Sequence, residues 1–261
     1  MMRTKIYLFS LLALLFTACD HIADDDRLIP VDSKTATDDA TQVARNILLE
    51  DFTGQRCINC PTGADYIRKM EEAYPDRIIP VGIYWEPQPV ANGLALPLGD
   101  TYYKYWNIQE QPSGLVNRHG IVKYTDWTAQ VAKELQQTSH LSLQVQASLS
   151  DRQITITVTS QGIGGSTSGK LQVWVLEDGI TAIQLMPDGN INRDYVHNHV
   201  LRTAVNGVWG EDFALGDGES KTHTLTQAVD NSWDTSHLSI VAFVYNEAGV
   251  EQATKTNVQQ Q

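Results

Sequence analysis

The chain has 261 residues, of which 42% are hydrophobic and 19% are charged. Its 31 acidic residues outnumber its 19 basic ones, which gives a formal net charge of −12 at pH 7. This hydrophobic fraction is typical of a packed protein and excludes a chain that is disordered throughout. The negative charge argues against nucleic acid as a partner, because it repels a phosphate backbone. With only three cysteines, the chain is not a small fold built on a disulfide framework.

The first 18 residues (1–18) have the pattern of an export signal. Arg3 and Lys5 precede an apolar run over residues 6–16, which is too short to span a bilayer. The run ends in Phe16-Thr-Ala-Cys19, which resembles the bacterial lipobox except for Phe where Leu is usual. The resemblance implies that Cys19 is acylated and anchors the chain to a membrane. The alternative is ordinary signal cleavage with an incidental cysteine.

Residues 19–45 are expected to form an acidic tether. They contain Asp24-Asp25-Asp26 among Ser, Thr and Ala, without an apolar period. Mutual repulsion keeps such a segment extended. An acidic run just after the lipidated cysteine resembles the signal that sends lipoproteins of the Bacteroidetes to the cell surface. A linker that is merely solvated is the alternative.

The segment 46–137 is expected to alternate strands and helices. Apolar runs predict strands at 46–52, 78–85 and 114–117, and one-sided apolar periodicity predicts helices at 62–73 and 126–137. The segment 86–106, with three prolines and a cluster of aromatic residues, is expected to be an insertion with some helix. This order indicates an α/β domain.

The pattern changes near residue 138. Apolar and polar residues alternate over 141–147 and 154–159, and further strands are expected at 171–176 and 238–245. Half-buried antiparallel strands separated by Gly- and Ser-rich joints are typical of a β-sandwich. The expected fold is therefore an α/β domain over 46–137 followed by an all-β, sandwich-like domain over 138–261.

The C-x-x-C pair of Cys57 and Cys60 is the main chemical motif of the chain. It follows the strand expected at 46–52 and opens a helix, where free backbone N–H groups and the helix dipole stabilise a thiolate. The second cysteine is close enough to close a disulfide, and an exported protein can keep one. The spacing predicts thiol–disulfide exchange, with protein thiols or disulfides as partners.

The residues before the pair resemble the thioredoxin signature, in which an Asp-Phe precedes the first cysteine by six residues. Asp51 stands at that place. The resemblance implies a thioredoxin-like α/β domain in which Asp51 is buried, has a raised pKa and accepts a proton from Cys60. It also implies that Pro112 is a cis-proline opposite the cysteines, and that the backbone of Gln111 pairs with a partner peptide.

The motif also departs from that family. Arg56 replaces the usual tryptophan before the first cysteine, and Ile-Asn replaces Gly-Pro between the cysteines. A cation at position 56 is expected to favour the thiolate of Cys57 and to border the partner groove. These differences leave the direction of exchange open.

Two other interpretations of the cysteine pair remain open. A zinc site would need further ligands, for which His197 and His199 are candidates far along the chain. The other interpretation is a permanently oxidised, structural disulfide between Cys57 and Cys60. No metal and no cofactor is expected, because the chain has no phosphate-binding loop, nucleophile elbow or EF-hand spacing.

Over its whole length the chain resembles the 28-kDa outer-membrane lipoprotein family of the Bacteroidetes. The resemblance depends on the lipobox, on Glu50-Asp-Phe-Thr-Gly with C-x-x-C-Pro, and on segments 116–118, 177–180 and 197–202. It implies a lipid-anchored protein on the periplasmic or surface face of the outer membrane. Two functions remain open: thiol–disulfide exchange, or a non-enzymatic accessory role in which the β domain binds a protein partner.

Overall fold

The computed structural model describes residues 41–91 and 93–261. The expected signal peptide, Cys19 and most of the expected tether lie outside these residues. Of the described residues, 49% lie in strands and 17% in helices. No helix within the described ranges is both long and apolar enough to cross a membrane.

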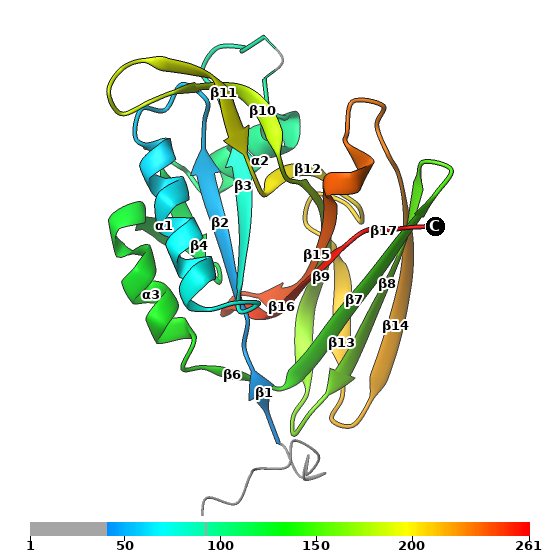
Figure 1. The fold of residues 1–261 in the computed structure, drawn as a ribbon. Helices are drawn as coiled ribbons and strands as arrows, with labels where there is room; N and C mark the ends of the chain where they lie inside the picture. The colour runs from blue at the N-terminus through cyan, green and yellow to red at the C-terminus, as the bar shows by residue number, and fades with distance from the viewer. Residues whose placement is uncertain (1–40, 92) are drawn as a thin grey trace, which may run out of the picture. The chain divides into compact units, whose positions relative to one another are not determined.

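A nine-stranded sheet organises the fold (Figure 1). Its strand order is β16-β15-β9-β12-β3-β2-β4-β5, and β13 pairs with β9 beside this path. The strands are β2 (Ile47–Thr53), β3 (Ile78–Tyr84), β4 (Ser113–Val116), β5 (Ile121–Lys123), β9 (Thr167–Glu177), β12 (Val200–Ala204), β13 (Glu211–Leu215), β15 (Leu238–Asn246) and β16 (Gly249–Asn257). The strands β2 and β3 run parallel and are buried at every position. This explains why their sequences are largely apolar, with Glu50 and Asp51 as buried charged exceptions in β2.

Helices cover both faces of β2. Ile47 and Leu49 share a core with α1 (Cys60–Ala73) and α3 (Trp127–Glu134). Leu48 and Phe52 pack instead with Tyr102 of α2 (Pro97–Tyr105). Successive side chains of a strand point to opposite faces, which accounts for this division. Two short 3₁₀ helices, η2 (Tyr124–Asp126) and η3 (Thr235–His237), precede α3 and β15.

A second sheet of four strands packs against the nine-stranded one. Its order is β14-β8-β7-β17, formed by β7 (Leu141–Ser150), β8 (Gln153–Gly162), β14 (Ser220–Ala228) and β17 (Gln259–Gln260). The period-two alternation predicted for β7 and β8 is confirmed by their burial pattern. Their buried side chains share one core with those of β9, β13 and β15.

Two further pairs of strands complete the fold. The hairpin of β10 (Ile180–Leu185) and β11 (Ile191–His197) is antiparallel. The short strand β1 (Val43–Ala44) pairs with β6 (Thr138–Ser139) and lies inside the range expected for the tether.

The expected fold class is wrong. The sequence predicted a thioredoxin-like α/β domain followed by a separate all-β domain, but the structure is β-rich and one sheet takes strands from both parts. The join is β12 with β3, where Val200 lies opposite Gly82 and the Gly82 N–H donates to the His199 carbonyl at 2.7 Å. An apolar run indicates that a strand is buried. It does not indicate which other strand pairs with the N–H and C=O groups at its edge, so the shared sheet was not predicted.

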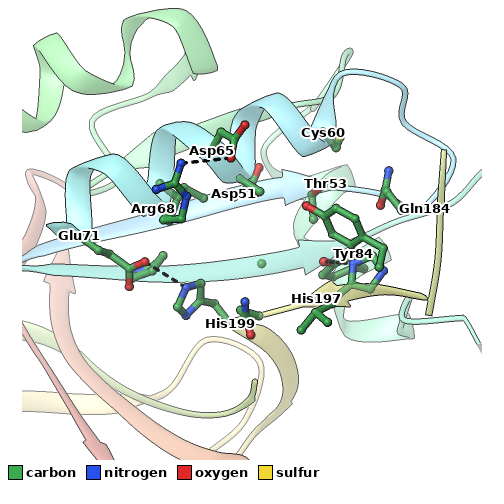
Figure 2. A pocket seen from close by; sticks show the side chains of 17 residues that line it. Asp51, Thr53, Cys60, Asp65, Arg68, Glu71, Tyr84, Gln184, His197 and His199 are labelled. Carbon is green, nitrogen blue, oxygen red and sulfur yellow. Dashed lines mark hydrogen bonds and ion pairs between the residues drawn. The ribbon is translucent and has the colours of Figure 1, made fainter. Parts of the chain in front are cut away.

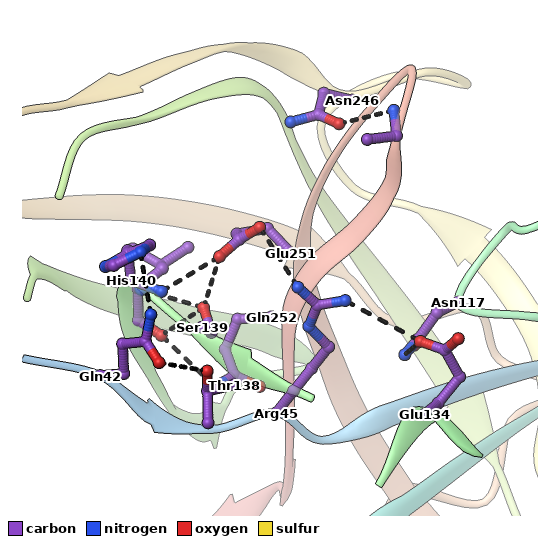
Figure 3. A network of polar contacts seen from close by, with 12 residues as sticks. Gln42, Arg45, Asn117, Glu134, Thr138, Ser139, His140, Asn246, Glu251 and Gln252 are labelled. Atoms are coloured by element: carbon purple, nitrogen blue, oxygen red, sulfur yellow. Dashed lines mark hydrogen bonds and ion pairs between the residues drawn. The ribbon is translucent and has the colours of Figure 1, made fainter. Parts of the chain in front are cut away.

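A polar network also joins segments far apart in sequence (Figure 3). Arg45 beside β1 lies 3.8 Å from a carboxylate oxygen of Glu134 in α3 and 3.6 Å from one of Glu251 in β16. The other oxygen of Glu251 accepts hydrogen bonds from the Ser139 hydroxyl at 2.8 Å and the His140 N–H at 3.1 Å. These groups connect β1 and β6 to α3 and to β16 of the large sheet.

Candidate functional site

A disulfide joins Cys57 and Cys60 in the turn between β2 and α1. Cys60 is the first residue of α1, and Pro61 follows it, in the first turn, where a missing N–H costs nothing. Cys60 is 3% exposed, whereas Cys57 is half-buried. A sulfur atom of another molecule can therefore approach Cys57 more readily than Cys60.

Asp51 lies beneath this turn. Asp51 and Cys60 line the same cavity of about 210 Å³, between α1 on one side and β11 on the other (Figure 2). The Asp51 side chain is 5% exposed, and its Oδ1 has no hydrogen-bond partner among the described residues. Burial raises the pKa of Asp51 to about 8. The carboxyl group is therefore mostly protonated at neutral pH.

The Gln111–Pro112 peptide bond is cis. Pro112 packs against the first turn of α1, since a Cβ added to Gly63 would lie 3.1 Å from the Pro112 Cβ. The side-chain amide of Gln111 donates to the carbonyl of Thr53 at 2.7 Å and to that of Trp85 at 3.1 Å. The structure thus brings Pro112 and the side chain of Gln111 to the cysteine end of β2, while pairing of the Gln111 backbone with a partner remains a prediction.

Arg56 is exposed at the edge of the site. Its backbone N–H donates to the carboxylate of Glu86 at 3.1 Å. Burial raises the pKa of Glu86, and the nearby positive charge of Arg56 partly opposes that rise. The carboxylate of Glu86 thus lies next to Arg56 at the edge of the site, which was not foreseen from the sequence.

The hairpin of β10 and β11 lies against the loop between β2 and α1 that carries Cys57, here called the cysteine loop (Figure 1). The side-chain amide of Gln184 donates to the carbonyl of Cys57 at 3.0 Å and to that of Gly54 at 3.3 Å. The Leu185 N–H donates to the Gln55 carbonyl at 2.8 Å. Sequence reasoning missed Gln184, because a single glutamine in an ordinary strand gives no signal of its partner.

Tyr84 and His197 form a buried polar pair in the cavity wall. The Tyr84 hydroxyl and His197 Nδ1 are 2.9 Å apart. Burial lowers the pKa of His197 to about 4, so its imidazole is neutral at physiological pH. The Nε2 atom of His197 has no hydrogen-bond partner within the described ranges.

His199 lines the same cavity at its other end, as Figure 2 shows. Its Nε2 lies 3.3 Å from a carboxylate oxygen of Glu71 in α1, and its Nδ1 lies 3.3 Å from one of Asp178. His197 and His199 therefore line the same cavity as Cys60, but both cysteine sulfurs are in the disulfide. Residues 41–91 and 93–261 contain no group of three or more His, Cys, Asp or Glu side chains that could hold a metal ion.

Comparison with known proteins identifies relatives of this chain. The family model described as outer membrane protein Omp28 matches residues 99–261, a range that begins after the cysteine pair. A domain of the outer membrane lipoprotein Omp28 from Porphyromonas gingivalis is 30% identical, with 47% of this chain and 91% of that chain covered and a TM-score of 0.36. No curated protein matches the chain.

Two other solved structures share the fold more completely. HBP35 of Porphyromonas gingivalis has a TM-score of 0.68 at 17% identity, with 83% of this chain and 76% of that chain covered. Protein AGR_C_4864 from Agrobacterium tumefaciens has a TM-score of 0.50 at 17% identity, with 82% of this chain and 95% of that chain covered. At these identities the likeness concerns the fold alone.

Proposed function

The chain belongs to the Omp28 family of outer membrane lipoproteins, and we propose that within this location it performs thiol–disulfide exchange. The observation that carries the proposal is the unequal burial of the two sulfurs beside a protonated carboxyl. Cys57 is half-buried, while Cys60 is buried and shares a cavity with Asp51. The partners are proteins with a dithiol or a disulfide.

The oxidised protein would act on a partner dithiol in two steps. A partner thiolate attacks Cys57 Sγ, a partner–Cys57 bond forms, the Cys57–Cys60 bond breaks, and the electron pair leaves on Cys60. Asp51 gives its proton to the Cys60 thiolate. A second partner thiolate then attacks the partner sulfur of the mixed disulfide and releases Cys57 as a thiolate. The partner loses two electrons to this protein and gains a disulfide.

The reduced protein would run the same steps backwards on a partner disulfide. The Cys57 thiolate, beside the N-terminus of α1, attacks the partner, and a partner thiolate leaves. Asp51 then takes the proton of Cys60 as Cys60 attacks the mixed disulfide. A pKa of about 8 for Asp51 is close to that of an ordinary thiol, at about 8.5. Such matching suits proton transfer in either direction.

The test is turnover by the purified full chain with insulin as the disulfide substrate and dithiothreitol as the reductant. We expect the wild type to accelerate insulin reduction and Cys57→Ser to lose this acceleration entirely. Cys19→Ala is the matched control, because it removes a cysteine outside the pair and should keep full activity. Full activity in Cys57→Ser would refute the exchange mechanism.

An accessory role with a structural disulfide is the second candidate. It is favoured by the buried hydrogen bonds of Gln184, which tie the cysteine loop to the β10–β11 hairpin. In that case the wild type and Cys57→Ser would show the same insulin reduction, and the variant would unfold at a lower urea concentration. The protein would then act through a partner bound by the part of the chain beyond residue 137.

The membrane anchor is a separate proposal. We assign acylation to Cys19, which lies outside the described residues, on the strength of the apolar run and small residues before it. Cys19→Ala should appear in the soluble fraction of fractionated cells, while Cys57→Ser should stay with the outer membrane. Retention of Cys19→Ala in the membrane would contradict the assignment.

A further inference from the structure

A second cavity, of about 700 Å³, lies between the end of α2 and the strands β9 and β15. This volume falls in the range of roughly 300–1,000 Å³ that is usual for small-molecule sites. Aromatic rings supply much of its wall, and a few charged or amide side chains complete it. The aromatic residues are Tyr105, Trp106, Trp209 and Tyr245. We propose that this cavity binds a neutral saccharide.

The aromatic wall is held in place by the protein itself. The hydroxyl of Tyr102 donates to the Val208 carbonyl at 2.6 Å, and that of Tyr245 donates to the Trp209 carbonyl at 2.8 Å. The loop that carries Trp209 is thereby fixed before any ligand arrives, which lowers the entropic cost of binding.

Tyr105 supplies the accessible ring surface. It is 63% exposed, and its ring centre lies 4.3 Å from that of Trp209. The two rings are tilted by 49° to each other, and the exposed face of Tyr105 offers an apolar stacking surface. The C–H face of a pyranose ring is flat and slightly positive, so it suits the negative face of such a ring.

The positive charges around the cavity are already neutralised. Arg118 makes two hydrogen bonds with the Glu50 carboxylate, at 3.0 and 2.9 Å, and its guanidinium lies 4.1 Å from the ring centre of Tyr245. Lys170 pairs with Asp212 at 2.6 Å. An anionic ligand would therefore meet only the exposed Lys170, which already has Asp212 as a partner. A cationic ligand would find the Tyr245 ring face taken.

Glu247 adds an acceptor to the cavity wall. In the part of the chain that the structure describes, its carboxylate makes no ion pair. It would repel an anion and can accept a hydrogen bond from a hydroxyl group. Conversely, Arg118 Nη1 has no hydrogen-bond partner among the described residues, although the side chain is only 2% exposed.

This combination of groups selects the ligand class. Sugar hydroxyls both donate and accept, so they serve the Glu247 carboxylate and the Lys170 ammonium group together. A proline-rich peptide also packs on aromatic rings, but it has carbonyl acceptors and few donors, which leaves Glu247 without a partner. The pattern therefore favours a neutral saccharide over a peptide.

The experiment titrates the full chain with maltotriose, cellotriose, mannotriose and triacetylchitotriose. Binding is followed by calorimetry and by the fluorescence of the tryptophans in the cavity. We expect saturable binding of at least one trisaccharide at millimolar concentration or below. Tyr105→Ala should weaken it by about tenfold or more. Tyr74→Ala, which removes an exposed tyrosine at the end of α1, is the matched control and should bind as the wild type does.

Three results would overturn the proposal. One is that none of the four trisaccharides binds, and another is that Tyr105→Ala binds as tightly as the wild type. The third is preference for choline, trigalacturonate or decaproline over every trisaccharide. Glu247→Gln distinguishes the ligand classes further, because it keeps an acceptor oxygen and should weaken a saccharide by less than about threefold. The same variant would abolish most binding of a cationic ligand, which depends on the carboxylate charge.

Discussion

The side-chain amide of Gln184 donates a hydrogen bond to the carbonyl of Cys57 at 3.0 Å, across 127 positions of the chain. The glutamine belongs to β10, which lies between β9 and β12 in sequence but outside the nine-stranded sheet. The cysteine loop is therefore held by a hairpin from the later part of the chain.

Replacing Gln184 by leucine should destabilise the protein. The carbonyls of Cys57 and Gly54 would lose a buried donor, and each such loss costs about 1–3 kcal/mol. Urea unfolding of the oxidised protein measures the change in the free energy of unfolding. Gln161→Leu, at an exposed position of β8, is the control and should change stability little. Equal stability of the two variants would show that the contact contributes nothing.

Asp51→Asn should change how stability depends on pH. The pKa of this carboxyl is raised from 3.8 to about 8 by burial. Between these values the folded state binds more protons than the unfolded state, so the free energy of unfolding falls as pH rises, by up to about 1.4 kcal/mol per pH unit. The amide does not titrate. We therefore expect Asp51→Asn to be more stable than the wild type at pH 8 and to have a flatter profile between pH 4 and 8.

The check is urea unfolding at several pH values across that range. Asp151→Asn makes the same chemical change at an exposed turn and should leave the profile unchanged. The proposed role in proton transfer predicts in addition that Asp51→Asn reduces insulin more slowly at pH 7. A variant with the wild-type profile would mean that Asp51 is charged in the folded protein.

The two cysteines should differ in reactivity after reduction. Cys57 is half-buried and lies before α1, whereas Cys60 is almost fully buried. In variants that also carry Cys19→Ala and so keep a single thiol, iodoacetamide should modify Cys57 of Cys60→Ser at least about tenfold faster than Cys60 of Cys57→Ser. Mass spectrometry gives the two rates. The difference should vanish in urea, and equal rates in the folded proteins would contradict the assignment of Cys57 as the attacking sulfur.

Replacing only one of Glu50 and Arg118 should lower the free energy of unfolding much more than replacing both. Their side chains are 0% and 2% exposed. Arg118→Met alone leaves a buried carboxylate and should cost about 3–5 kcal/mol, while Glu50→Leu combined with Arg118→Met should recover much of this. Chemical denaturation of the wild type, Glu50→Leu, Arg118→Met and the double variant completes the cycle. Lys170→Met, which breaks an exposed pair, should change stability much less. Simple addition of the two single costs in the double variant would contradict this view.

Local elements in the first part of the chain followed from the sequence. Strands were predicted at 46–52 and 78–85, and the structure has β2 and β3 there; the helix predicted at 62–73 is α1. Their apolar patterns depend on neighbours a few residues away. The helix predicted at 126–137 is also confirmed, although the α-helix spans only Trp127–Glu134 and Asp126 belongs to the preceding 3₁₀ helix η2.

The later part of the chain was predicted less completely. No strand was predicted between residues 177 and 237, where the structure has β10, β11, β12, β13 and β14. Strands such as β11 are exposed at most positions, so they lack the apolar alternation by which a strand is recognised. The contact of Gln184 with the first part of the chain was missed together with these strands.

Residues close together in the chain were enough to suggest the chemistry of positions 51–60, because a strand end, a carboxylate and two cysteines three residues apart are local features. The same local information could not reveal that β12 completes the edge of β3, or that Asp51 and His197 face one cavity. Those relationships depend on which distant backbone groups satisfy each other and on which side chains lose their water. Both are settled when the whole chain packs.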